Sequence, residues 1–287
     1  MIISVILPLY NSHKLVRACV DSIIAQTSND WELIIVDTPD MTHGSSVIAP
    51  DPRISVVTFV DSMQDSGRFD TPKRQNLAAS FTKGDYLLLI DHDMILPNYL
   101  FDELQRIAAH SYPDAINISE DSFGFGRWAL AKTVERRAYW GDPVVESPRC
   151  IRKTTWDKLH GLDESIGAAY DMDFRHKLRE VNASIINAQS LIFHDEGQLT
   201  LKRLLTKKAM YGPDIYQYAK KRSLNAAINF FPIRKGFLDF KAMSQHGSHI
   251  ITDIFIMKLL EYAAGFYGIL KWKLKEIVNP SEIQRRY

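Results

Sequence analysis

The sequence has few of the residues that would indicate a disulfide framework, a cysteine-bound metal or a membrane span. Its only cysteines are Cys19 and Cys150, which are far apart and have no metal-ligand spacing. This usage is typical of a reducing compartment. No run of about 18 uncharged apolar residues occurs, so we expect no membrane-spanning helix. The first residues carry neither a basic segment nor a small-residue cleavage site, so we expect a strand there and no signal peptide.

The chain also lacks an excess of one charge, because its formal net charge is +1 at pH 7. The charges are nevertheless unevenly divided. Residues 200–287 contain 16 Lys and Arg against 6 Asp and Glu, whereas residues 1–199 contain 19 against 28. Such a division predicts two surfaces with different partners. The 287 residues are enough for one large α/β domain or two small ones with a substantial core.

Short apolar runs alternate with segments of helical spacing through the first 200 residues. Strands are predicted at 2–7, 31–36, 54–59, 86–90, 115–119 and within 184–193, and helices at 12–26, 73–81, 97–110, 132–139 and 171–180. Strands separated by helices predict βαβ units and a mainly parallel central sheet flanked by helices. Residues 121–128, which include two glycines, are predicted to form a flexible turn. Beyond residue 197 the pattern is almost entirely helical. We therefore expect a catalytic domain over 1–199 and a basic helical C-terminal extension over 200–287.

Two acids stand one residue apart in Asp91-His92-Asp93, directly after the apolar run Tyr86–Ile90. Like charges this close raise each other's pKa unless a cation neutralises them. Hard oxygen ligands select Mg²⁺ or Mn²⁺, which commonly bind together with a substrate phosphate. One interpretation is therefore a cation that holds a nucleotide diphosphate, and the other is a solvated turn with two incidental acids. Pro8–Asn11 and Asp37 also follow strands, and ligands bind at the carboxyl ends of parallel strands, which favours the nucleotide site.

Five stretches, in order along the chain, resemble the family 2 glycosyltransferases, which have the GT-A fold. They are Ser4–Asn11, Gln26–Asp37, Lys73–Asn76 with Gly84-Asp85 and the DxD motif, Gly161–Glu164, and Asp171–Phe174. The resemblance covers about residues 2–212. It implies an inverting enzyme that uses Mn²⁺ or Mg²⁺ and moves a sugar from a nucleotide-diphosphate sugar to an acceptor hydroxyl. Two positions depart from the family: Thr38 where a second acid is frequent, and Tyr170 where Glu is common.

The resemblance also implies roles for the acids. Asp171 is the expected base, since a carboxylate within hydrogen-bond reach can take the proton of an acceptor hydroxyl. Its alternative is a helix N-cap or first-turn acid that interacts with the helix dipole. Asp93 is expected to bind the metal directly. Asp91 is expected to contact the ribose or to bind the metal through water.

Further residues are expected around the donor. Pro8, Tyr10, Asn11 and Asp37 would form the base and ribose pocket, with Tyr10 stacked on the base. Arg74 would reach the diphosphate, because a guanidinium suits bidentate phosphate contacts.

His194 is expected to end the last strand and to complete the metal or diphosphate site. A packed surface imidazole is its alternative. Glu120, Arg136 and Arg149 are expected to line the acceptor side.

Apolar and basic residues are interleaved near the C-terminus. The apolar pairs include Leu259-Leu260, Phe266-Tyr267 and Ile269-Leu270, and Lys271–Lys275 follow them. A helix of this kind can lie in a membrane interface, where each basic residue near an anionic leaflet contributes about 1 kcal/mol. It can also pack on the catalytic domain with a solvated basic face. We expect a cytoplasmic protein attached peripherally to the inner face of the cell membrane, with a glycan or lipid-linked sugar as acceptor. No nucleic-acid partner is expected, because no recognised binding module accompanies the charge.

Two other functions fit parts of the sequence. A haloacid-dehalogenase-type phosphatase also carries DxD after an apolar strand, but there the motif follows the first strand. It also has Thr or Val two residues after the second Asp, where Ile95 stands here. A degenerate glycosyltransferase that only binds sugar nucleotides would be consistent with Thr38 and Tyr170.

Overall fold

The computed structural model describes residues 1–9, 13–38, 44–60, 70–222, 247 and 249–278. Its main feature is a 7-stranded sheet with the strand order β3-β2-β1-β4-β8-β6-β9. The strands are β1 (Ile3–Pro8), β2 (Trp31–Asp37), β3 (Ile54–Thr58), β4 (Tyr86–Leu89), β6 (Ala115–Asn117), β8 (Cys150–Arg152) and β9 (Ile185–Asn187). The pairs from β3 to β4 are parallel, and β8 runs antiparallel to both of its neighbours. The mainly parallel sheet expected from the sequence is therefore confirmed.

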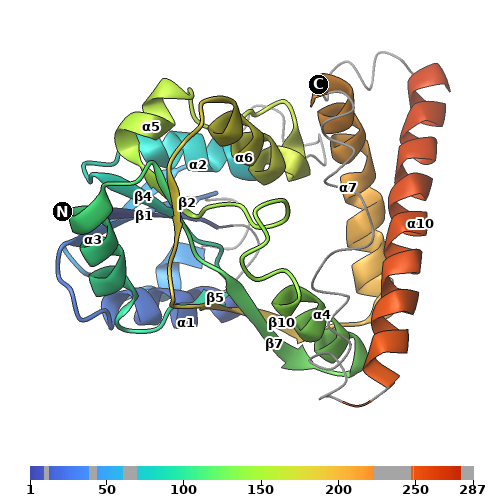
Figure 1. Cartoon of the computed structure of the whole chain (residues 1–287), viewed down its shortest axis with the longest axis horizontal. Helices are drawn as coiled ribbons and strands as arrows, with labels where there is room; N and C mark the ends of the chain where they lie inside the picture. Colours follow the sequence, from blue (N-terminus) through green and yellow to red (C-terminus); the bar gives the residue numbers. More distant parts are fainter. Residues whose placement is uncertain (10–12, 39–43, 61–69, 223–246, 248, 279–287) are drawn as a thin grey trace.

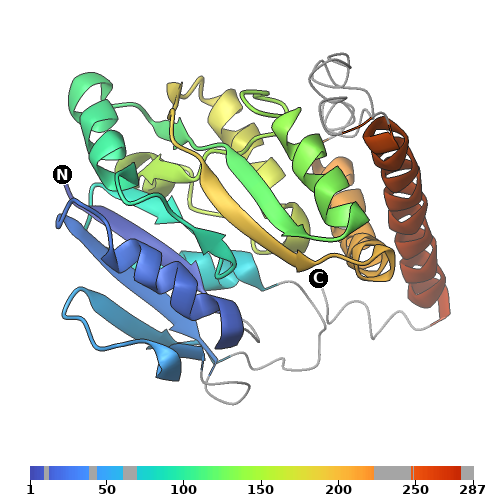
Figure 2. The same cartoon turned by 90° about the horizontal axis from the view of Figure 1, so that it is seen from below.

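Helices cover both faces of this sheet, which explains why its central strands are continuous apolar runs (Figures 1 and 2). Helices α1 (His13–Ile24) and α3 (Leu100–Ser111) pack on one face, where Val5, Leu7 and Leu88 point. The other face carries α2 (Thr71–Ser80), α5 (Lys153–Lys158) and α6 (Tyr170–Glu180). A short 3-10 turn, η1 (Gly44–Val47), follows β2, and another, η2 (Gly167–Ala169), leads into α6.

A second sheet of three strands has the order β5-β10-β7 and lies beside the first (Figure 1). It consists of β5 (Met94–Ile95), β7 (Glu120–Phe125) and β10 (Ile192–Gln198), and α4 (Arg127–Arg137) packs against it. The flexible turn predicted over 121–128 is therefore wrong. Gly124 suggested a turn, but a Cβ there would lie 2.6 Å from the carbonyl oxygen of Gly197. The glycine is needed for close strand packing, so it does not indicate a loop.

Two long helices, α7 (Leu201–Arg222) and α10 (His249–Val278), stand side by side at the edge of the molecule (Figures 1 and 2). Their backbones approach closely at small residues, because a Cβ at Gly212 would lie 2.3 Å from the carbonyl oxygen of Gly265. Lys258 of α10 donates hydrogen bonds to Glu135 of α4 at 2.8 Å and to Glu261 at 2.9 Å. The helical character expected beyond residue 197 is confirmed for these two segments. No helix in the described ranges is long and apolar enough to cross a membrane. The division into units at residue 199 stays a prediction.

Candidate functional site

Three predicted residues lie together at the carboxyl edge of the main sheet. Pro8, Asp37 and Asp91 follow or end β1, β2 and β4, which are neighbours in the sheet. Such an edge is the usual ligand-binding side of a parallel sheet. Tyr10 and Asn11 fall outside the described residues.

Asp37 is buried, with 7% of its surface exposed, and both of its carboxylate oxygens accept backbone hydrogen bonds. Oδ1 accepts from the N–H of Thr38 and Oδ2 from that of Ser45, each at 2.9 Å. The carboxylate therefore fixes the segment that follows β2. Next to it the hydroxyl oxygen of Thr38 is buried and has no hydrogen-bond partner in the part of the chain that is described. Sequence reasoning noted Thr38 only as a departure from the family and missed it as a polar group available to a ligand.

Arg74 lies in α2 and is almost completely buried. Its Nε donates to Asp70 at 2.9 Å, its Nη1 donates to the carbonyl oxygen of Leu9 at 3.0 Å, and its guanidinium lies over the ring of Phe59. These contacts hold the segment after β1 in place. A direct contact between Arg74 and a diphosphate stays a prediction.

The DxD motif forms a turn between β4 and β5, closed by a hydrogen bond of 3.1 Å from the N–H of Met94 to the carbonyl oxygen of Asp91. Strand β5 then pairs antiparallel with β10, so that Met94 lies opposite His194. The N–H of Asp195 also donates to the carbonyl oxygen of Asp93 at 2.8 Å. Strand pairing thus brings His194 to the DxD motif. The prediction that His194 ends its strand is wrong, since β10 continues to Gln198 through its pairing with β7.

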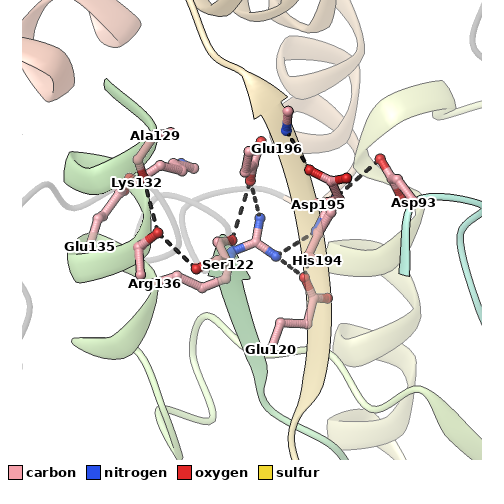
Figure 3. A network of polar contacts seen from close by, with 12 residues as sticks. Asp93, Glu120, Ser122, Ala129, Lys132, Glu135, Arg136, His194, Asp195 and Glu196 are labelled. Carbon is pink, nitrogen blue, oxygen red and sulfur yellow. Dashed lines mark hydrogen bonds and ion pairs between the residues drawn. The ribbon is translucent and has the colours of Figure 1, made fainter. Parts of the chain in front are cut away.

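His194 lies between two carboxylates (Figure 3). Its Nε2 is 3.2 Å from Oδ2 of Asp93, and its Nδ1 is 3.1 Å from Oε2 of Glu120. Nη1 of Arg136 also lies 2.8 Å from Nδ1. Because a guanidinium only donates, Nδ1 can donate to Glu120 when it carries the proton and accept from Arg136 when it does not.

Glu120 is the centre of this network (Figure 3). Arg149 donates from Nε to Oε1 of Glu120 at 2.7 Å, and Arg136 forms an ion pair with Oε2. Arg149 also reaches toward the motif, with Nη1 3.6 Å from Oδ2 of Asp91. Nη2 of Arg136 donates to Glu196 at 3.0 Å. The three residues expected on the acceptor side, Glu120, Arg136 and Arg149, therefore lie directly behind the metal motif.

The electrostatics of this cluster favour the ionised forms of Asp93 and Glu196. Burial alone would raise the pKa of Asp93, but the hydrogen bond and charge of His194 outweigh it and hold that pKa well below its usual value. Burial likewise opposes ionisation of Glu196, while His194 and Arg136 lower its pKa. The pKa of Arg136 is lowered by burial, which the charge of Glu196 opposes.

The residues around Asp93 fit a cation that is carried in by its substrate. Oδ1 of Asp93 is buried and accepts no hydrogen bond from any described residue. Nε2 of His194 faces Asp93, and Glu120 behind Nδ1 is the second partner that a metal-binding histidine commonly has. Within the described ranges no group of three or more His, Cys, Asp or Glu residues forms a complete metal site. A cation held by one or two protein ligands takes its other ligands from phosphates and water, as Mg²⁺ usually does.

Asp171 lies in the first turn of α6, where its Oδ1 accepts a hydrogen bond from the N–H of Met172 at 2.8 Å. Two tyrosines lie within the field of both Asp171 and the DxD motif. The pKa of Tyr170 is raised well above its usual value, chiefly by burial and then by the charges of Asp91 and Asp171. Burial and the same two carboxylates also raise the pKa of Tyr211, which lies in α7. The predicted base Asp171 and Asp91 of the DxD motif therefore both lie near these two phenols.

Helix α7 fixes the segment that carries Asp171. Asp214 accepts a hydrogen bond from the N–H of Ala168 in η2 at 2.8 Å, three residues before Asp171. Arg222 donates to the fully buried Asp173 at 2.7 Å. Lys207 of α7 lies near enough to the motif for its charge to lower the pKa of Asp93, after the larger effects of burial and His194. Sequence reasoning placed α7 in an extension and missed these contributions to the site.

Comparisons with known proteins show which proteins this chain is similar to. Residues 4–136 match the profile of glycosyl transferase family 2. The chain is 27% identical to the poly(ribitol-phosphate) beta-N-acetylglucosaminyltransferase TarP of Staphylococcus aureus over 169 residues. These residues cover 54% of this chain and 50% of that protein. It is 26% identical over 156 residues to the uncharacterized glycosyltransferase EpsJ of Bacillus subtilis, covering 53% of this chain and 40% of that protein.

Solved structures share the fold. The structure of S. aureus TarS 1–349 in complex with UDP-GlcNAc superposes with a TM-score of 0.56 at 16% identity, covering 100% of this chain and 93% of that one. The chain spans about 40% of the length of the first curated relatives that it matches. The profile match, the relatives and the shared GT-A architecture agree on one assignment. The profile match over residues 4–136 and the similar proteins therefore support a glycosyltransferase of family 2.

Proposed function

We propose that this protein is an inverting glycosyltransferase that moves a sugar from a nucleotide-diphosphate donor to an acceptor hydroxyl. The observation that carries the proposal is the proximity of two acidic groups from distant parts of the chain to the same two tyrosines. Asp91, which follows β4, and Asp171, at the start of α6, both lie near enough to Tyr170 and Tyr211 for their charges to raise the pKa of each phenol, in addition to the larger effect of burial. A sugar placed between the two acids would have its diphosphate on one side and its acceptor on the other.

The reaction is a single displacement. The acceptor oxygen forms a bond to the anomeric carbon while the bond from that carbon to the diphosphate oxygen breaks, which inverts the configuration. Asp171 takes the proton of the acceptor hydroxyl. Its carboxylate is partly exposed, as an acceptor-facing base must be, and one of its oxygens is held by the N–H of Met172.

The leaving diphosphate needs positive charge. Asp93 and His194 would hold Mn²⁺ or Mg²⁺, with Asp91 nearby. Such a cation, when bound, neutralises charge on the diphosphate as it leaves. Arg149 contacts both Glu120 and Asp91, so it holds the motif in place from behind.

A uridine nucleotide is our first choice of donor, because TarS was crystallised with UDP and with UDP-GlcNAc. The relative TarP is named as a transferase that acts on poly(ribitol-phosphate), a polymeric acceptor. For this chain we propose a glycan or a lipid-linked sugar as acceptor, met by a protein attached peripherally to the inner face of the membrane.

The test is donor binding followed by analysis of the product. Ligand binding raises the apparent melting temperature by mass action. We expect UDP or a UDP-sugar with Mn²⁺ to raise it, and the same ligand with EDTA to have a smaller effect. Proton NMR of the transferred sugar should show the opposite anomeric configuration to that in the donor. A product with retained configuration, or no binding of any nucleotide across UDP-, GDP- and dTDP-sugars, would refute the proposal.

A further inference from the structure

The outward face of α10 is almost wholly apolar. Apolar residues recur at every third or fourth position, so they form one stripe along the helix. The members with more than 60% of their surface exposed are Phe255 62%, Leu259 72%, Phe266 62%, Leu274 63%, Ile277 76% and Val278 74%. The stripe is about 35 Å long at 1.5 Å per residue. Monomeric soluble proteins rarely expose a continuous apolar surface of this extent.

The opposite face of α10 is firmly held, so this stripe is not a loosely packed core. Ile250, Ile254 and Met257 are buried against α4 and the start of α7. Asp253 pairs with Arg127 of α4, and Lys258 pairs with Glu135. Near the other end, a Cβ at Gly268 would lie 1.9 Å from the carbonyl oxygen of Ala209, so α7 and α10 are in backbone contact there. The helix is therefore fixed with one apolar face inward and the other outward.

Most of the acidic residues of α10 lie on its inward face, whereas most of its basic residues lie at its C-terminal end. Asp253 and Glu261 point inward, where they pair with basic residues, so neither lies in the stripe. The exposed basic residues Lys271, Lys273 and Lys275 lie at the C-terminal end of the stripe, where they outnumber the one exposed acid, Glu276. The whole segment 200–287 also carries the excess of basic residues described above. An apolar stripe with lysines at its end complements an anionic lipid surface, in which apolar residues enter the interface and lysines remain at the headgroups.

We propose that the outward face of α10 binds the surface of an anionic bilayer, with the helix lying flat on it. This binding deepens the proposed function, because it names the surface at which the enzyme would meet its acceptor. Only this link to the acceptor rests on the proposed function, whereas the binding to lipid does not. Figures 1 and 2 show α10 at the outer edge of the molecule, beyond α7 and away from the main sheet. A bilayer at that face would therefore leave the carboxyl edge of the sheet accessible to a donor from solution.

The experiment is co-sedimentation of the full chain with sucrose-loaded vesicles, without any sugar donor. We expect the wild-type protein to bind vesicles of phosphatidylcholine with 30% phosphatidylserine, and to bind pure phosphatidylcholine at least tenfold more weakly at low salt. The variant Phe266→Glu/Leu270→Glu places two acids in the stripe and should lose at least tenfold in binding. The matched control Phe81→Glu/Val181→Glu makes the same charge change at exposed apolar residues of the catalytic part and should bind like wild type.

Folding and oligomeric state are checked on the same proteins. Thermal melting by circular dichroism should be unchanged, because these side chains are exposed. If the double variant does not fold, Leu259→Gln/Leu274→Gln serves in its place. Wild type that does not bind anionic vesicles, or a stripe variant that binds them fully, would overturn the proposal. The proposal would also be overturned if light scattering showed a dimer for the wild type and a monomer for the stripe variant. The stripe would then be an interface between two copies of the protein. Nucleotide binding is measured separately, so loss of the proposed function would leave this result intact.

Discussion

Nε2 of His194 lies 3.2 Å from Oδ2 of Asp93, although one residue is inside β10 and the other follows β4. The pairing of β5 with β10 produces this relationship, because β5 begins directly after Asp93. Two ligands of one small cation, each about 2.1 Å from it, are separated by a similar distance when they are adjacent. The spacing of the pair would therefore allow it to share the proposed cation.

Replacing either member should remove that cation without unfolding the protein. We expect His194→Ala and Asp93→Asn each to weaken Mn²⁺ binding in the presence of UDP by more than tenfold. Isothermal titration with Mn²⁺ measures this, and the exposed His110→Ala in α3 is the control. Unchanged Mn²⁺ affinity in both variants would refute the assignment of the site.

Glu120 should affect the proposed cation site indirectly, through His194. When Nδ1 of His194 donates to Glu120, Nε2 is left unprotonated and able to bind a cation. Glu120→Gln should therefore lower Mn²⁺ affinity by about 10- to 100-fold, the usual effect of removing such a partner. Glu196→Gln is the matched control, because the carboxylate of Glu196 accepts its hydrogen bonds from Arg136 and Ser122. Equal losses in the two variants would show that the effect comes from Arg136 and not from the histidine.

Asp171→Asn should separate proton chemistry from binding. An amide cannot accept the acceptor's proton, so we expect kcat to fall by about 10²- to 10⁴-fold while UDP affinity stays within twofold. Steady-state assays with a UDP-sugar and isothermal titration with UDP provide the two numbers. Asp157→Asn, in the exposed part of α5, is the control. Sugar transfer at the wild-type rate in the Asp171 variant would mean that another group is the base.

The positions of most residues expected around the donor could be predicted from the sequence, because they depend only on which residues directly follow a strand. A buried strand followed directly by polar residues predicts where those residues lie, and Pro8, Asp37, Asp91 and Asp93 all follow that rule. The resemblance to a known family added Asp171 and His194, which no local pattern distinguishes from a helix cap or a packed imidazole.

The rest could not be predicted because it depends on packing between distant segments. Gly124 and Gly126 are of the residue type that is frequent in turns. Only the close approach of the carbonyl oxygen of Gly197 shows that Gly124 belongs to a strand. The hydrogen bond from Arg74 to the carbonyl oxygen of Leu9 likewise joins distant segments, while the contact of Arg74 with a diphosphate stays a prediction. The role of α7 depends on tertiary contacts of Asp214 and Arg222, which have no sequence signature.

Lys207 offers a test of that role of α7. Its positive charge already acts on Asp93, so a diphosphate bound there would lie within its field. We expect Lys207→Ala to weaken UDP binding about tenfold, the cost of one charged contact. Lys202→Ala is the control, because Lys202 lies five positions earlier and thus on a different face of the same helix. Equal UDP affinity in the two variants would show that α7 supports the site without contacting the donor.

Asp114 should stabilise the fold in a way that depends on pH. Burial alone would raise its pKa, but hydrogen bonds from Ser184 and Thr155 and the charge of Arg152 lower that pKa from 3.8 to about 2. A carboxyl whose pKa is lower in the folded state contributes stability above its unfolded pKa and loses it as the pH falls through the folded value.

Asp114→Asn should therefore lower the free energy of unfolding by about 1–2 kcal/mol at pH 7, and the difference from wild type should shrink between about pH 4 and pH 2. Urea denaturation at pH 7 and near pH 3 measures both differences. Asp157→Asn, at a more exposed carboxyl, should show a smaller difference at pH 7. If the cost of Asp114→Asn is the same at both pH values, it arises from lost neutral hydrogen bonds to Ser184 and Thr155, and the ionised carboxylate contributes nothing of its own.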